Sequence, residues 1–167
     1  MRKDYLYIAL CLPICLFIYL FYRTEYTVIN QIFIALTSKE TFFAIKEIVT
    51  TALPLPKLIV YSLPEGLWVF CIALTSKSLF VKIRRREIDL IFVPLLVAIA
   101  WEFLQLFHVT NGQFDFIDIG FSILFWIIAK YLIKDNNKRQ NIVKPFNMRS
   151  FICIFSYAIV YLSHVCQ

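Results

Sequence analysis

The sequence predicts an all-α fold: a multi-pass transmembrane helix bundle with about five spans and one interfacial amphipathic helix. The chain is 60% hydrophobic and 17% aromatic, with a mean hydropathy of +0.74. A soluble domain of this length would have too little polar surface to cover itself at that composition. Apolar runs of span length also alternate with short charged segments. We therefore expect residues 1–167 to form a single integral membrane domain whose main partner is the lipid bilayer.

The net charge of +6 does not by itself indicate a nucleic-acid partner. The basic residues lie between the apolar runs, where they are typical of a topology signal. The five cysteines lie mostly inside apolar runs and have no metal-ligand spacing, so we expect neither a metal site nor another cofactor.

The first predicted span covers residues 5–22, which is long enough to cross a bilayer at about 1.5 Å per residue. A basic start and an apolar run also resemble a signal peptide, but no small-residue cleavage site follows, so we expect the span to be retained. Pro13 lies near its middle and is expected to kink the helix or to leave one carbonyl free.

The connection after this span contains the predicted amphipathic helix, at about 38–53. Thr37 is the expected N-cap, with Glu40 three residues later completing a capping box. The apolar residues that follow at helical spacing are Phe42, Ile45, Ile48, Val49 and Ala52. Such a helix lies most simply in the membrane interface, and Pro54 and Pro56 are expected to end it.

The second predicted span, 58–76, contains Pro64 and Glu65 several residues inside its apolar run. Proline removes a hydrogen-bond donor and disfavours helical angles in the residue before it. We therefore predict a break before a helix that starts near Leu63, in a place covered by protein or water. Glu65 could cap that helix together with Ser62, or face a cavity, and the two interpretations are compatible.

Three further spans are predicted at 90–107, 117–133 and 150–165. The loops at 77–89 and 134–149 hold most of the lysines and arginines, together with the N-terminus. The positive-inside rule then places the N-terminus in the cytoplasm and the C-terminus outside, in the cytoplasmic membrane of the cell.

This topology brings polar residues from separate spans together at the outer surface. The candidate ligand-binding residues are Glu65, Glu102, Gln105, His108, Asp115 and Asp118. A spacing of three residues places the second to fourth of these on one slanting stripe of a helix, and the two aspartates on one face of the next.

Each of these residues also has a structural interpretation. A carboxylate at mid-membrane costs roughly 2.5 kcal/mol or more, so Glu102 needs a partner, water or a proton. Gln105 favours a helix–helix hydrogen bond, and His108 favours solvation at the membrane surface. Asp118 could simply complement the helix dipole, while Asp115 is expected to be solvent-exposed.

The motif Glu102-x-x-Gln105, a polar turn, and Phe114-Asp115-Phe116-Ile117-Asp118 resembles the VanZ-like family of small bacterial membrane proteins. The segment Ser62-Leu63-Pro64-Glu65-Gly66 fits divergent members, and the resemblance covers mainly residues 60–130. The family often has an arginine in the turn and an asparagine one turn after the aspartate, where this chain has Gly112 and Ser122. The resemblance implies a membrane fold and a site rather than a reaction.

Three functions remain open at this level, and the first is preferred to the transport and enzyme alternatives. An outward-facing acidic pocket could bind an envelope component, such as a lipid-linked precursor, or a small cationic or antibiotic-related ligand. The carboxylates could instead serve proton- or metal-coupled transport, with the break at Pro64 as part of the site. In the third, Glu102, His108 and Asp118 would form a hydrolytic site, although H-E-x-x-H and G-x-S-x-G motifs are absent from the sequence.

Overall fold

The computed structural model describes residues 3–24, 28–110, 113–134 and 138–165. The chain is mostly helical, as predicted. Its α-helices are α1 (Lys3–Tyr22), α2 (Val28–Leu36), α3 (Lys39–Ala52), α4 (Lys57–Ser76), α5 (Val93–Leu106), α6 (Phe116–Ile127) and α7 (Met148–Val165). Gly112, at one of the departures from the VanZ-like pattern, lies outside the described residues.

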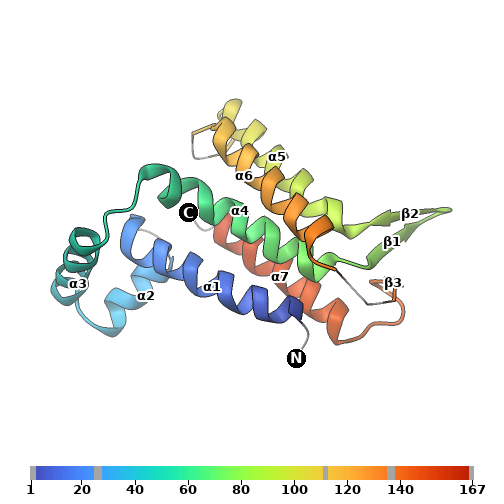
Figure 1. Ribbon diagram of the computed structural model, residues 1–167, viewed down its shortest axis with the longest axis horizontal. Helices are drawn as coiled ribbons and strands as arrows, with labels where there is room; N and C mark the ends of the chain where they lie inside the picture. The colour runs from blue at the N-terminus through green and yellow to red at the C-terminus, as the bar shows by residue number, and fades with distance from the viewer. Residues whose placement is uncertain (1–2, 25–27, 111–112, 135–137, 166–167) are drawn as a thin grey trace.

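Helix α4 is the centre of the bundle. It contacts α1, α5, α6 and α7, and most of its second half is buried. Helix α1 lies on one side of it and the antiparallel pair α5–α6 on the other (Figure 1). Phe70, Leu74 and Ala129 belong to the apolar core between α4 and the end of α6.

The predicted break at Pro64 is wrong, because α4 runs without interruption from Lys57 to Ser76. Pro64 and Ser62 are both buried inside this helix, so Ser62 cannot be the N-cap of a helix starting near Leu63. Pro56 takes that position at the real start of α4. Packing on every side of α4 holds the helix together across the lost backbone hydrogen bond, which the local sequence could not show.

The other predicted spans correspond to helices. Helix α1 continues through Pro13. The predicted segment 90–107 is a 3-10 turn, η1 (Leu90–Phe92), followed by α5, which has Pro94 in its first turn. Helix α6 continues into a π-helical turn, η2 (Ile128–Leu132), and α7 covers the last predicted segment.

Helices α2 and α3 lie together beyond the end of α1 (Figure 1). The predicted amphipathic helix is confirmed as α3, but its N-cap is Ser38 and not Thr37. The Ser38 hydroxyl accepts a hydrogen bond from the Thr41 amide at 3.1 Å, while the Thr37 hydroxyl donates to the Phe33 carbonyl of α2 at 2.8 Å. Helix α2 was not predicted, because its apolar run is too short to cross a membrane.

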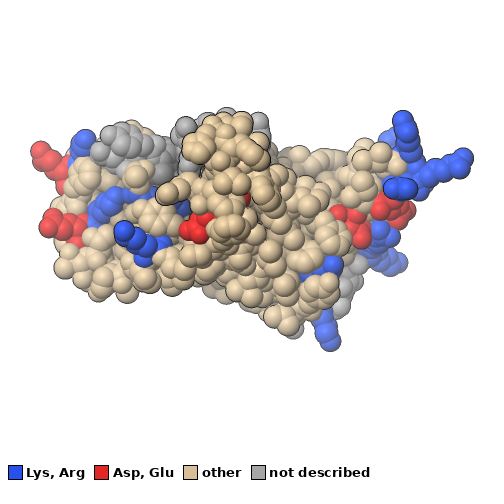
Figure 2. All heavy atoms as spheres, turned by 90° about the horizontal axis from the view of Figure 1, so that it is seen from above, with Lys and Arg blue, Asp and Glu red and all other residues tan. Residues whose placement is uncertain are grey.

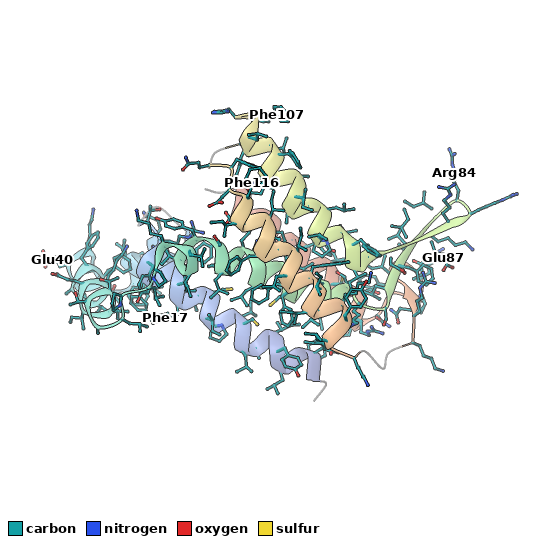
Figure 3. All side chains as sticks on the ribbon, turned by 45° about the horizontal axis from the view of Figure 1, so that its top comes forward. Phe17, Glu40, Arg84, Glu87, Phe107 and Phe116 are labelled. Atoms are coloured by element: carbon teal, nitrogen blue, oxygen red, sulfur yellow. The ribbon has the colours of Figure 1, made fainter. Side chains whose placement is uncertain are left out.

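The basic loop after α4 is a β-hairpin, which an all-α prediction does not contain. Strand β1 (Leu79–Ile83) pairs antiparallel with β2 (Arg86–Asp89), and β3 (Gln140–Asn141) joins β1 in parallel. Arg84 lies in the turn with a positive φ of 55°. The hairpin projects from the end of the bundle, with Arg84 at its tip (Figure 3).

Within the described part of the chain, two helices are long and apolar enough to cross a membrane, namely the segments Asp4–Tyr22 and Lys57–Ser76, with hydropathies of 2.1 and 1.7. Shorter apolar helices occur at Leu90–Leu106 and Met148–Ala158. Charged side chains gather towards the two ends of the elongated molecule, and the band between them is mostly uncharged (Figure 2).

Candidate functional site

A cleft of about 1080 Å³ opens among α1, α4, α5 and α6. Five of the six predicted site residues line it: Glu65, Glu102, Gln105, Asp115 and Asp118. They come from three helices and from the turn that joins α5 to α6. The continuous α4 places Glu65 here directly, without the predicted break.

Glu102 is the most buried carboxylate of the cleft, with only 5% of its surface exposed. Its Oε2 atom accepts a hydrogen bond from the backbone N–H of Asp115 at 3.0 Å. The Glu102 side chain of α5 thereby holds Asp115, the residue directly before α6, in place. This contact uses one carboxylate oxygen for structure, and Glu102 remains in the wall of the cleft.

Asp115 is the N-cap of α6, where its Oδ1 accepts a hydrogen bond from the Ile117 amide at 2.8 Å. A capping carboxylate satisfies an amide that has no partner inside the helix. Asp115 is half-buried rather than solvent-exposed, because its backbone is tied to Glu102. The expectation that it would face solvent is wrong.

Asp118 lies in the first turn of α6, where the helix dipole favours a negative charge. Its carboxylate lies near the Ser62 hydroxyl of α4, and both residues line the cleft. The Oδ1 atom of Asp118 is buried and has no hydrogen-bond partner in the described part of the chain. Asp118 therefore lies at the α4–α6 contact and still has an oxygen available for another donor.

Glu65 lines the cleft from α4, beside Trp68 of the same helix. It lies close enough to Asp118 for their charges to interact. Gln105 lines the cleft one turn after Glu102, as the predicted stripe on α5 requires. A slanting stripe of polar residues on α5 thus faces α4 and α6.

His108 is not brought into the cleft. It follows the end of α5 with a positive φ of 57°, and its exposed ring lies 3.2 Å from the carbonyl of Leu106. The stripe breaks here because α5 ends at Leu106, so helical spacing no longer applies to residue 108. This part of the molecule is the far end of the α5–α6 pair, marked by Phe107 and Phe116 in Figure 3.

Basic and aromatic residues that the sequence did not mark as site residues also line the cleft. Arg23 follows the end of α1, Lys57 starts α4, and Tyr19, Tyr61 and Trp101 also line the walls. The Arg23 guanidinium lies 5.2 Å from the centre of the Tyr19 ring and 4.8 Å from that of Tyr61. The spacing of four residues between Tyr19 and Arg23 could have indicated the first of these contacts.

Three buried polar atoms of the cleft have no hydrogen-bond partner among the described residues. They are the Nε of Arg23, the Oγ1 of Thr110 and the Oδ1 of Asp118. Buried polar groups are nearly always satisfied by protein, water or a ligand. The cleft therefore offers a hydrogen-bond donor, a carboxylate acceptor and a hydroxyl group to which a polar molecule could bind.

The described residues contain no group of three or more His, Cys, Asp or Glu side chains arranged to hold a metal ion.

Comparisons with models of known families, with curated proteins and with solved structures gave no match to this chain.

Proposed function

We propose that the chain is an integral membrane protein whose helices α1, α4, α5, α6 and α7 cross the cytoplasmic membrane. The apolar length of α1 and α4 supports this proposal. So do the exposed large apolar side chains on the outer helices, which include Leu10 and Leu12 of α1, Leu96 and Phe103 of α5, Leu124 of α6, and Phe151 and Phe155 of α7. Large apolar side chains exposed on several helices are typical of surfaces that face a membrane or a partner protein.

The two ends of the bundle fit opposite membrane surfaces. The N-terminal end of α1, the basic hairpin and β3 lie at one end, while α2 and α3 lie at the other (Figure 1). The positive-inside rule assigns the hairpin end to the cytoplasm. The amphipathic α3 would then rest in the outer interface, near the cleft.

We further propose that the cleft binds a ligand through a cationic group. One observation carries this proposal: carboxylates from α4, α5 and α6 line a single cleft, and Asp118 still has a buried oxygen without a partner. Carboxylates at membrane depth are costly, and they usually mark functional sites. An ammonium group would satisfy them through charge-assisted hydrogen bonds.

The resemblance to VanZ-like proteins supports an envelope role for this ligand. Glu65, Glu102, Gln105, Asp115 and Asp118 carry that resemblance, and all of them line the cleft. An amine-bearing envelope component on the outer surface is thus the ligand class that we propose.

The alternatives lose their main supports. Transport drew on a broken helix at Pro64, and α4 is continuous there. Hydrolysis drew on Glu102, His108 and Asp118 acting together, and His108 lies outside the cleft.

The experiment is a titration of the purified chain with ethanolamine in a neutral maltoside micelle, followed by calorimetry. Glu65→Gln, Glu102→Gln and Asp118→Asn are expected to weaken binding by about tenfold or more each, as loss of a charged hydrogen bond does. Glu47→Gln on the exposed face of α3 is the matched control, because it removes one carboxylate that does not line the cleft. Equal affinity in all four variants would refute a cation site in the cleft.

A further inference from the structure

We infer that the ligand of the cleft is a zwitterion. Its ammonium group would bind the carboxylates, and its phosphate or carboxylate group would bind Arg23 and Lys57. This inference rests on the proposed function and adds the anionic half of the ligand. It starts from the position of Arg23, the residue directly after α1.

Arg23 is fixed in place by two helices. Its guanidinium lies over the rings of Tyr19 in α1 and Tyr61 in α4, and its Nη2 donates to the Tyr61 carbonyl at 3.3 Å. The backbone carbonyl of Arg23 also accepts a hydrogen bond from Lys46 of α3 at 2.8 Å. The two rings and the Tyr61 carbonyl hold the guanidinium in the wall of the cleft, where its remaining N–H groups can bind an anion.

The carboxylates of the cleft do not neutralise this guanidinium by direct pairing. Glu65 and Asp118 lie close enough to interact with the charge of Arg23. Yet Arg23 forms no ion pair with a carboxylate of the described residues, and its Nε is buried without a partner. A cation that served only to balance the acidic residues would pair with one of them, so the geometry favours an external anion.

Lys57 gives the same wall a second positive charge. It is the first residue of α4 and is exposed at the cleft, one turn before Tyr61. The basic wall therefore comes from the end of α1 and the start of α4, whereas Glu102, Asp115 and Asp118 come from α5 and α6. Helix α4 separates α1 from the α5–α6 pair in the bundle (Figure 1).

The size of the cleft and its aromatic lining fit such a ligand. A volume of about 1080 Å³ exceeds that of a single small ion and matches that of sites for extended molecules. Tyr19, Tyr61 and Trp101 lie in its walls. Tyrosine and tryptophan favour the membrane interface, which is where zwitterionic headgroups lie.

The inference is tested with three probes in neutral maltoside micelles: O-phosphoethanolamine, ethanolamine and inorganic phosphate. The wild-type chain is expected to bind O-phosphoethanolamine about tenfold more tightly than ethanolamine, since one charged hydrogen-bonded contact is added. Arg23→Gln is expected to remove this preference, measured as the ratio of the affinities for O-phosphoethanolamine and ethanolamine in the same variant. Lys57→Gln, at an exposed helix start where folding is not at risk, is expected to reduce the preference in the same direction.

Arg85→Gln at the tip of the hairpin is the control, because it removes one positive charge at the other end of the bundle. Equal affinities for O-phosphoethanolamine and ethanolamine, or an unchanged preference in both Arg23→Gln and Lys57→Gln, would overturn the zwitterion inference and leave the cation site intact. Failure of every amine to bind would remove the proposed function as well.

A headgroup and a soluble molecule can present the same chemistry, and lipid nanodiscs separate them. If the source is a lipid, the wild-type chain taken from phosphatidylethanolamine nanodiscs should retain that lipid in native mass spectrometry, and Arg23→Gln should not. If the soluble probe binds and no lipid is retained, the zwitterion inference holds with a soluble ligand.

Discussion

The carboxylate of Glu102 accepts a hydrogen bond from the backbone amide of Asp115 at 3.0 Å. Glu102 is buried near the end of α5, and Asp115 caps the start of α6. The two residues together close the turn between these helices at the cleft. A residue predicted to bind a ligand therefore also holds the architecture of its own site.

Two substitutions of Glu102 separate these roles. Glu102→Gln keeps an oxygen that can accept from the Asp115 amide, so thermal stability should be close to that of the wild type while ethanolamine binding is weakened by about tenfold or more. Glu102→Ala leaves the amide without a partner and should lower the free energy of unfolding by about 1–3 kcal/mol. Thermal unfolding in the same micelle measures both, and equal melting of the two variants would contradict the structural role.

The contact between α4 and α6 depends on the lack of a side chain at Gly66. A Cβ atom there would lie 2.4 Å from Cδ2 of Phe125 and 3.2 Å from the backbone carbonyl of Phe121. The ring of Phe125 can move, but the carbonyl belongs to α6 itself, so the helices must shift. Gly66→Ala should cost about 1–3 kcal/mol of stability through overpacking.

Gly120 offers the matched control for this change, because it lies in α6 with no atom within 4 Å of the position of an added Cβ. Gly120→Ala should be neutral or stabilise the helix by about 0.5–1 kcal/mol. Unfolding curves that rank the two variants in the opposite order would show that α4 and α6 are not packed in this way.

Much of this architecture follows from the sequence, because long apolar runs can satisfy their backbone only as helices in a membrane-like environment. The predicted break in α4 is wrong because the energetic cost of Pro64 can be read from the local sequence, whereas the packing that holds α4 together comes from other helices. The hairpin was not predicted because the charges of Arg84, Arg85 and Arg86 indicated a loop. The apolar residues of its first strand, Leu79, Val81 and Ile83, do alternate as a strand requires. The pairing of β1 with β3 joins residues that are far apart in the chain, so no local sequence pattern could predict it.

The candidate site was predicted in part for a similar reason. The residues of α5 and α6 share helical periodicity, so Glu102, Gln105 and Asp118 could be placed on facing helices. Arg23 could not be placed, because it reaches the cleft only through the packing of α1 against α4. The periodic stripe also extended to His108, beyond the point where the helix ends.

The membrane topology predicts labelling from opposite sides. In a chain whose native cysteines are replaced by alanine, Arg85→Cys and Lys138→Cys should react with an impermeant maleimide from the cytoplasmic side. Gln113→Cys should react from the outside, since its turn lies at the far end of the α5–α6 pair. All three positions are exposed, so access within the protein does not limit the reaction. Labelling of Arg85→Cys and Gln113→Cys from one side would refute the proposed crossing of α5.

The last prediction concerns Arg139, which links β3 to the hairpin across 50 residues of sequence. Its guanidinium donates to Asp89 at 2.6 Å and to Glu87 at 2.9 Å, and it lies 4.9 Å from the centre of the Phe80 ring. The hydrogen bond with Asp89 raises the pKa of Arg139, so the group stays charged at any physiological pH. The contact is solvent-exposed, and such ion pairs add little to global stability.

Arg139→Gln should therefore leave the melting temperature nearly unchanged and instead loosen the hairpin locally. Amides of β1 and β2 should exchange with deuterium several-fold faster, since local opening depends on these few contacts. Arg85→Gln removes the same charge from the tip, where no ion pair is formed with the described residues, and should leave exchange unchanged. Equal exchange in Arg139→Gln and the wild type would mean that the backbone ladder between β1 and β2 suffices, and that Arg139 does not hold the sheet together.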